Sequence, residues 1–163
     1  MGLACATRIM PLEFSQPVVY LYIHLHSSPK PNHMETKEKE TKGLGMPWET
    51  EYGYAQAVRA GDTVWLSGQL GHDEKGALAE GMAAQMRQTY ANIRTLLSAY
   101  GLTMDDVTEE TVYVLDVQAA FAARKKLGRE VYGDPMQVAS TLIGVVGLAL
   151  PGQLVEIKIT ARK

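Results

Sequence analysis

Two helical stretches alternate with strands over the last two thirds of the chain, and this order restricts the possible folds more than any other feature. In residues 79–100, apolar side chains recur three, four and seven positions apart, which is typical of a helix packed against a core. A second helix is predicted over 119–132, where Gly133-Asp134-Pro135 ends it. Strand-like segments lie before, between and after these helices.

The strands are recognised by their alternation of apolar and polar side chains. Two short strands joined by a turn at 60–62 are predicted within 54–68, and another strand within 107–117. The run 138–150 is apolar and β-branched, and 153–161 alternates regularly. This order predicts an α+β fold in which hairpins close both ends and one mixed β-sheet carries two helices on one face.

Two helices can cover only one face of such a sheet. Val64 and Leu66 are predicted to share one face of their strand, and Trp65 to lie on the other. The glycine-containing run 142–149 adds to the uncovered face. Because an open apolar sheet face is normally covered by another subunit, we expect the chain to associate with copies of itself.

The first 46 residues differ in character from the rest. Residues 18–25 are apolar but too few for the roughly 20 residues that span a bilayer, and no signal peptide or lipidation pattern fits. Residues 34–43 are almost all charged residues and threonine, so we expect them to be solvated and mobile. The sequence thus predicts an extension over 1–46, with residues 1–33 lying upstream of a native start at Met34, and a folded domain over 47–163.

Composition argues against several functional classes. The formal net charge is -2, from 16 Lys and Arg against 18 Asp and Glu, so nucleic acid is not expected as a partner. Cys5 is the single cysteine, which forbids an internal disulfide and fits a cytoplasmic location. His24 and His26 lack a third ligand nearby, so no metal site is predicted, and His72 is expected to be a solvated turn residue. Residues around Ser67 do not form a Gly-x-Ser-x-Gly nucleophile elbow.

Four stretches together resemble one known family. They are 54-YAQAVRAGDTVWLSGQL-70, 84-AQMRQTYANIRTLLSAYGLTMDDV-107, 109-EETVYVLDV-117 and 150-LPGQLVEIKITA-161. In order and spacing they resemble the RidA/YjgF family, also described as the reactive intermediate deaminase or L-PSP endoribonuclease family, over about residues 47–163. The resemblance implies a chorismate-mutase-like fold and a homotrimer around a central barrel, with small-molecule clefts between subunits. It also implies hydrolysis of enamines and imines to 2-keto acids and ammonia, without metal or cofactor.

The resemblance places the family's cleft residues on particular positions of this sequence. Its tyrosine falls on Tyr54, and its serine falls on Ser67, followed by Gly68 and Gln69. Its glutamate, which positions water, falls on Glu156. Tyr54 also fits an ordinary half-buried strand aromatic, and Glu156 an exposed carboxylate at a sheet edge.

Two family positions carry different residues here. The family's arginine falls on Leu142, nine residues before Pro151, and the asparagine of its second helix falls on Lys125. A guanidinium binds a substrate carboxylate through two charge-assisted hydrogen bonds, which leucine cannot form. Losing such an anchor costs roughly 2–5 kcal/mol, a factor of tens to thousands in rate or affinity. Lys125 offers a cation, although a helix position between Arg124 and Lys126 also fits a solvated face.

The sequence therefore leaves the catalytic status open. One hypothesis is a hydrolase that acts on small imines or enamines with an altered substrate range. Another is a non-catalytic trimer that binds a small metabolite in the same clefts. A third is a chaperone-like or ribonuclease role, as names given to parts of the family suggest, but the chain has neither a basic face nor a recognisable ribonuclease pair.

Overall fold

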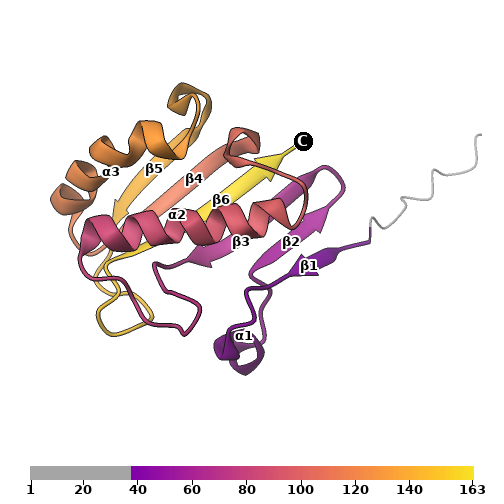
Figure 1. The fold of residues 1–163 in the computed structure, drawn as a ribbon, viewed down its shortest axis with the longest axis horizontal. Coiled ribbons are helices and arrows are strands. Elements are labelled where there is room, and N and C mark those ends of the chain that lie inside the picture. Colours follow the sequence, from indigo (N-terminus) through magenta and orange to yellow (C-terminus); the bar gives the residue numbers. More distant parts are fainter. Residues whose placement is uncertain (1–37) are drawn as a thin grey trace, which may run out of the picture. The chain divides into compact units, whose positions relative to one another are not determined.

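The computed structural model describes residues 38–163, which form one mixed β-sheet with two long helices across one face (Figure 1). The strands are β1 (Glu40–Lys42), β2 (Ala57–Ala60), β3 (Thr63–Gln69), β4 (Val107–Val114), β5 (Ala139–Gly144) and β6 (Val155–Arg162). The helices are α1 (Pro47–Tyr52), α2 (Met82–Ser98) and α3 (Val117–Val131), with 3-10 turns at Met104–Asp106 and Pro135–Gln137. The predicted α+β class is confirmed. None of the helices within this range is long and apolar enough to cross a membrane.

The strand order in the sheet is β1-β2-β3-β6-β4-β5. β6 lies between β3 and β4 and is antiparallel to both, whereas β5 is an edge strand parallel to β4. The predicted hairpin between the last two strands is therefore wrong. Because α3 connects β4 to β5, these two strands become parallel neighbours, and the segment 145–154 then carries the chain back to the centre of the sheet.

The core lies between the sheet and the pair α2 and α3 (Figure 1). Val64 and Leu66 of β3 are buried there, as predicted from their spacing, and Trp65 remains 42% exposed on the other face. Every second residue of β6 from Val155 to Ala161 is also buried, which fits a central strand. The fold thus covers one sheet face with helices and leaves the other open.

The charged segment before residue 47 contains a strand. β1 lies in the charged segment that was expected to be mobile, and it pairs antiparallel with β2 through Glu40↔Arg59 to Lys42↔Ala57. The hydroxyl of Tyr100 donates to the backbone oxygens of Glu40 and Ala57, at 3.0 and 3.1 Å, and so links α2's end to this edge. Backbone pairing forms β1, and hydrophobic patterns do not reveal such pairing. The expected upstream extension, with His24 and His26, lies outside the described residues.

Candidate functional site

A β-bulge interrupts β3 where its polar residues begin. Leu66 pairs with Ile159 and Gln69 with Ile157, so two residues of β3, Ser67 and Gly68, stand opposite one residue of β6. The Ser67 hydroxyl donates to the Ala55 carbonyl at 2.8 Å, which holds the bulge against the chain before β2. Bulges bend a strand and redirect side chains, and they are frequent beside binding sites.

Glu156 of β6 fits against this bulge. A Cβ added at Gly68 would overlap the Glu156 carboxylate, so the carboxylate can lie in this position only because residue 68 has no side chain. On its other side the carboxylate accepts a hydrogen bond at 3.1 Å from Gln153 Nε2. Gly68 and Gln153 together fix where the half-buried carboxylate lies.

A cavity of about 310 Å³, which we call the Glu156 cavity, opens beside this carboxylate. It brings together four residues predicted from the family resemblance: Tyr54, Ser67, Gly68 and Glu156. Its other walls, mostly apolar, are Trp48, Tyr52, Leu70, Ala149 and Leu150. The volume is at the lower end of the roughly 300–1,000 Å³ that small-molecule sites occupy. An apolar cavity with few convergent polar groups suits a small, largely uncharged ligand that carries one reactive group.

The remaining three predicted site residues do not line this cavity in the single chain. Gln69 is buried behind the bulge, where its Nε2 donates to Gln56 Oε1 at 2.8 Å and to the Ser67 carbonyl at 3.0 Å. Leu142 lies on β5 opposite Val112 and packs toward the helix side of the sheet. Lys125 is exposed on α3. A direct ligand contact by any of them stays a prediction.

Two buried glutamines position the loop before Glu156. Gln85 of α2 donates to the Gly152 carbonyl and accepts from the Leu154 amide, each at 2.8 Å. The side-chain oxygen of Gln153 accepts from the Leu150 amide at 3.1 Å, so its NH₂ group is turned toward Glu156. The sequence reasoning missed both residues, because their partners lie far away along the chain or across a turn.

Tyr54 supplies a protonated hydroxyl to the cavity lining. Burial raises the pKa of this phenol, and the negative charges of Glu49 and Glu156 raise it further. At neutral pH the group is therefore a hydrogen-bond donor to whatever occupies the cavity.

The prediction for His72 is wrong. Its side chain is only 3% exposed and meets Trp48 edge-on, with ring centroids 5.1 Å apart. Its Nδ1 lies 2.8 Å from the Asp73 carbonyl oxygen, and Asn92 of α2 donates to the backbone oxygen of His72 at 2.9 Å. The turn folds back onto α2, so His72 supports the tryptophan that forms one wall of the Glu156 cavity.

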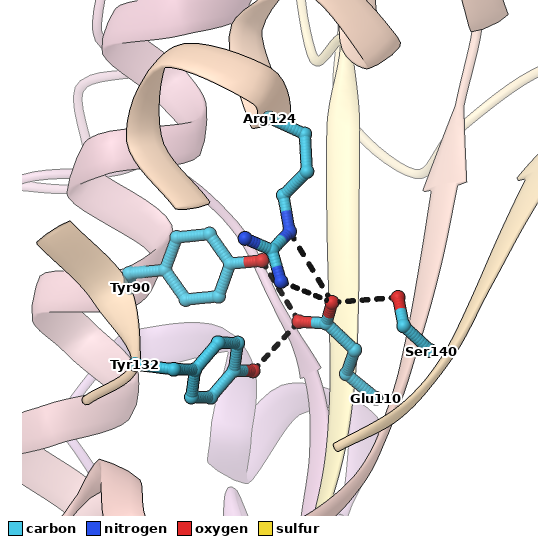
Figure 2. Close-up of polar contacts among 5 residues, drawn as sticks. All are labelled: Tyr90, Glu110, Arg124, Tyr132 and Ser140. Atoms are coloured by element: carbon cyan, nitrogen blue, oxygen red, sulfur yellow. Dashed lines mark hydrogen bonds and ion pairs between the residues drawn. The ribbon is translucent and has the colours of Figure 1, made fainter. Parts of the chain in front are cut away.

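A second polar cluster lies on the opposite, helix-covered side of the sheet (Figure 2). Its centre is Glu110 of β4, which is fully buried. Its carboxylate accepts from the hydroxyls of Tyr90, Tyr132 and Ser140 at 2.7–2.8 Å and from the Arg124 guanidinium at 2.8 and 3.3 Å. These donors come from α2, β5, α3 and the residue that follows α3. Protein groups saturate the carboxylate, so the cluster links structural elements and leaves no open position for a ligand.

Burial by itself raises the pKa of the Glu110 carboxyl, but the hydrogen bond from Tyr132 and the positive charge and hydrogen bond of Arg124 outweigh it. The net result is a lowered pKa, so Glu110 is ionised at neutral pH. Burial, reinforced by the charge of Glu110, raises the pKa of Tyr90 and Tyr132 far above their ordinary value. Both phenols therefore stay protonated and donate to the carboxylate.

Comparison with known proteins places this arrangement in a family. Residues 47–163 match the family described as Endoribonuclease L-PSP. The RutC family protein YjgH of Escherichia coli is 33% identical over 112 residues, which cover 69% of this chain and 84% of that protein. A 2-iminobutanoate/2-iminopropanoate deaminase of Salmonella typhimurium is 42% identical over 65 residues, 39% of this chain and 51% of that enzyme.

Solved structures agree with the sequence matches. Rv2704 of Mycobacterium tuberculosis, described as a member of the YjgF/YER057c/UK114 family, has a TM-score of 0.69 at 27% identity, over 77% of this chain and 100% of that one. The structure described as protein YJGH has a TM-score of 0.69 at 30% identity, over 77% of this chain and 96% of its own. The match over residues 47–163 and the similarity to these proteins show that the chain belongs to the Endoribonuclease L-PSP family, also called the RidA/YjgF family.

Proposed function

We propose that this protein hydrolyses small imines or enamines in the Glu156 cavity, with Glu156 as the general base. The observation that carries the proposal is the convergence of Tyr54, Ser67 and the fixed Glu156 carboxylate on one largely apolar chamber. A carboxylate held in place can accept a proton from water as the water oxygen attacks the C=N carbon. An enamine first takes a proton on carbon to become the imine. Glu156 then gives the proton taken from water to the nitrogen of the adduct, the C–N bond breaks, and the hydroxyl group loses its proton to solvent, so that ammonia or an amine leaves and a carbonyl compound remains.

Tyr54 and the apolar walls have complementary parts in this proposal. The Tyr54 hydroxyl donates a hydrogen bond to the ligand, and Trp48, Leu70 and Leu150 enclose its hydrocarbon part. Exclusion of water by these walls strengthens every polar contact inside the cavity. The name of the Salmonella relative, 2-iminobutanoate/2-iminopropanoate deaminase, supports the same chemistry.

We propose a homotrimer as the active assembly, with ligand clefts between subunits. Trp65 and Ile143, on the sheet face that no helix covers, are 42% and 37% exposed, and Val146 is fully exposed. Such apolar side chains favour burial against a second copy. Leu142 and Lys125 would reach a ligand only from a neighbouring subunit, since neither lines the cavity of its own chain.

Light scattering of the purified protein should give three times the chain mass of 17.9 kDa. The trimer places Trp65 at a contact, so Trp65→Lys should shift the population toward smaller species by introducing a buried charge. A wild-type protein that stays monomeric at micromolar concentration would contradict the assembly and the inter-subunit clefts with it.

The activity itself is tested with imines that a second enzyme generates in the assay mixture. A pyridoxal-phosphate dehydratase generates the enamine from serine or threonine, and semicarbazide captures the imine that remains. The protein should lower semicarbazone formation and release the keto acid faster. If even high protein concentrations accelerate the hydrolysis of no substrate, the hydrolase proposal is wrong.

The alternative is then a non-catalytic or chaperone-like trimer that binds a small metabolite. The absence of a cationic side chain among the residues lining the Glu156 cavity favours this alternative. A cytoplasmic location stays a prediction.

Gly68→Ala is expected to displace the Glu156 carboxylate while the protein stays folded. The added methyl group overlaps the Glu156 carboxylate, which must then leave the position in which it accepts from Gln153. Because the obstacle is the end of a flexible side chain, stability should change by less than about 1 kcal/mol. Hydrolysis should fall at least tenfold, since displaced catalytic groups lose much of their effect. Thermal unfolding and steady-state rates measure the two effects, and an unchanged rate would contradict the close contact.

A further inference from the structure

The Glu49 carboxylate of α1 accepts hydrogen bonds from three groups outside its own helix. Its Oε1 accepts from the backbone amides of Leu44 and Met46, at 2.9 and 3.1 Å, and from Gln56 Nε2 at 3.2 Å. The other carboxylate oxygen lies so close to Gly43 that a Cβ added there would overlap it. One carboxylate thus joins the segment before α1, the helix itself and the residue that leads into β2.

The hydrogen bonds continue from Glu49 to the β-bulge. Because Gln56 turns its NH₂ group toward Glu49, its side-chain oxygen faces Gln69. Gln69 Nε2 donates to that oxygen at 2.8 Å and to the Ser67 carbonyl at 3.0 Å. Gln56 and Gln69 are 2% and 1% exposed, and buried hydrogen bonds of this kind are strong because water does not compete for them. The network therefore attaches α1 to the sheet at the bulge.

α1 supplies two of the aromatic walls of the Glu156 cavity. Trp48 directly precedes Glu49, and Tyr52 is the last residue of the helix. The backbone oxygen of Glu49 also accepts from the Tyr54 amide at 3.1 Å, which fixes the start of the segment that follows. α1 has only six residues, and a helix of this length is not stable by itself in water. Its position therefore depends on contacts of individual side chains such as Glu49.

We propose that Glu49 is a positioning residue that holds α1 against the Glu156 cavity, so that Trp48 and Tyr52 select ligands by the length of their hydrocarbon chain. The inference rests on the proposed function and extends it to specificity. The Glu156 carboxylate is fixed separately, through Gln153 and the bulge. Separate contacts thus hold the reacting end of the ligand and enclose its hydrocarbon end.

Equilibrium binding of keto acids, the products of the proposed hydrolysis, tests the role of Glu49 without requiring turnover. Pyruvate, 2-oxobutanoate and 2-oxopentanoate each differ from the next by one CH₂ group. In the wild type, each added CH₂ group should tighten binding roughly fourfold, as expected for its burial against the aromatic walls. Glu49→Ala should reduce this step to less than about twofold. The affinity for pyruvate should stay within about threefold, because contacts to the two ends of the ligand are largely independent.

Two further variants of α1 serve as controls. Glu49→Gln keeps a side-chain oxygen that can accept the three hydrogen bonds, so it should retain most of the dependence on chain length. Glu51→Ala removes an exposed carboxylate from the same helix and should leave that dependence unchanged. Thermal unfolding is measured for each variant. If Glu49→Ala only lowers the melting temperature and keeps the wild-type dependence on chain length, Glu49 is a stabilising residue and the proposal is wrong.

Tryptophan fluorescence reports on the position of α1 without any ligand. The chain has two tryptophans, so in a Trp65→Phe background all of the signal comes from Trp48. Glu49→Ala should increase the quenching of this fluorescence by acrylamide, because the indole ring leaves its edge-on contact with His72. Glu51→Ala in the same background should not change it.

The two proposals can fail separately. Unchanged quenching of Trp48 in Glu49→Ala, or no binding of any of the three keto acids by the wild type at millimolar concentration, overturns the positioning role. If Glu49→Ala loses the dependence on chain length but the wild type hydrolyses no imine, the positioning role stands and the hydrolase proposal falls. If Glu49→Ala hydrolyses the imines from serine and threonine with the wild-type ratio of KM values, the hydrolase stands and the positioning role falls.

Discussion

Replacing Glu156 by glutamine should abolish imine hydrolysis while the protein stays folded and still binds ligand. The amide has nearly the same shape and fits the space left by Gly68, but it cannot take a proton from water. General base catalysis contributes about 10²- to 10⁴-fold, so we expect kcat to fall by that amount. Binding of 2-oxobutanoate should stay within about threefold or improve, because a negative charge near the carboxylate is removed.

The control for this variant is Glu130→Gln, which neutralises an exposed carboxylate on α3, far along the chain from the bulge. Rates are measured with imines generated in place, and circular dichroism verifies the fold. If Glu156→Gln keeps more than about a tenth of the wild-type kcat, another group activates the water and the assigned role is wrong. A loss of keto acid binding in parallel with activity would instead make Glu156 a ligand contact.

The alternation of apolar and polar residues predicts most of the strands and their buried faces correctly. This is because the burial of every second side chain leaves its pattern within each strand by itself. Val64 and Leu66 lie in the core and Trp65 on the open face, as their spacing predicts. The order of the strands depends on which segments meet in space, so the insertion of β6 between β3 and β4 did not follow from its own pattern. β1 was missed for a related reason: its backbone pairs with β2 although its side chains are polar and mostly exposed.

The candidate site, like the sheet, was predicted only in part from the sequence. Family resemblance brought Tyr54, Ser67, Gly68 and Glu156 together, and the structure finds them on one cavity. The aromatic walls and the glutamines that orient the loop come from α1, α2 and the segment before β6, and only the tertiary fold brings them near Glu156. One overlooked signal was present in the sequence: Glu110 is in phase with the buried residues Val112 and Val114, which indicates a charge on the core face.

That buried charge leads to the largest expected effect on stability. Glu110→Gln removes the negative partner of Arg124 and places NH₂ hydrogens where the carboxylate accepted hydrogen bonds from protein donors (Figure 2). Removing one member of a buried ion pair costs about 3–5 kcal/mol, and the 22% exposure of the Arg124 side chain points to the lower end of that range. Glu109→Gln, the exposed neighbour on the same strand, should change stability by less than about 0.5 kcal/mol.

The stabilisation by Glu110 should also depend on pH. The pKa of its carboxyl is lowered by folding from the ordinary value of 4.5, so the folded protein releases this proton more readily than the unfolded chain. The contribution is therefore complete above that ordinary value and disappears as the pH falls through the lowered one. Urea unfolding at equal protein concentration should show the gap between wild type and Glu110→Gln shrinking from about pH 7 to pH 3. A gap of constant size would mean that the shape of the side chain, and not its charge, accounts for the effect.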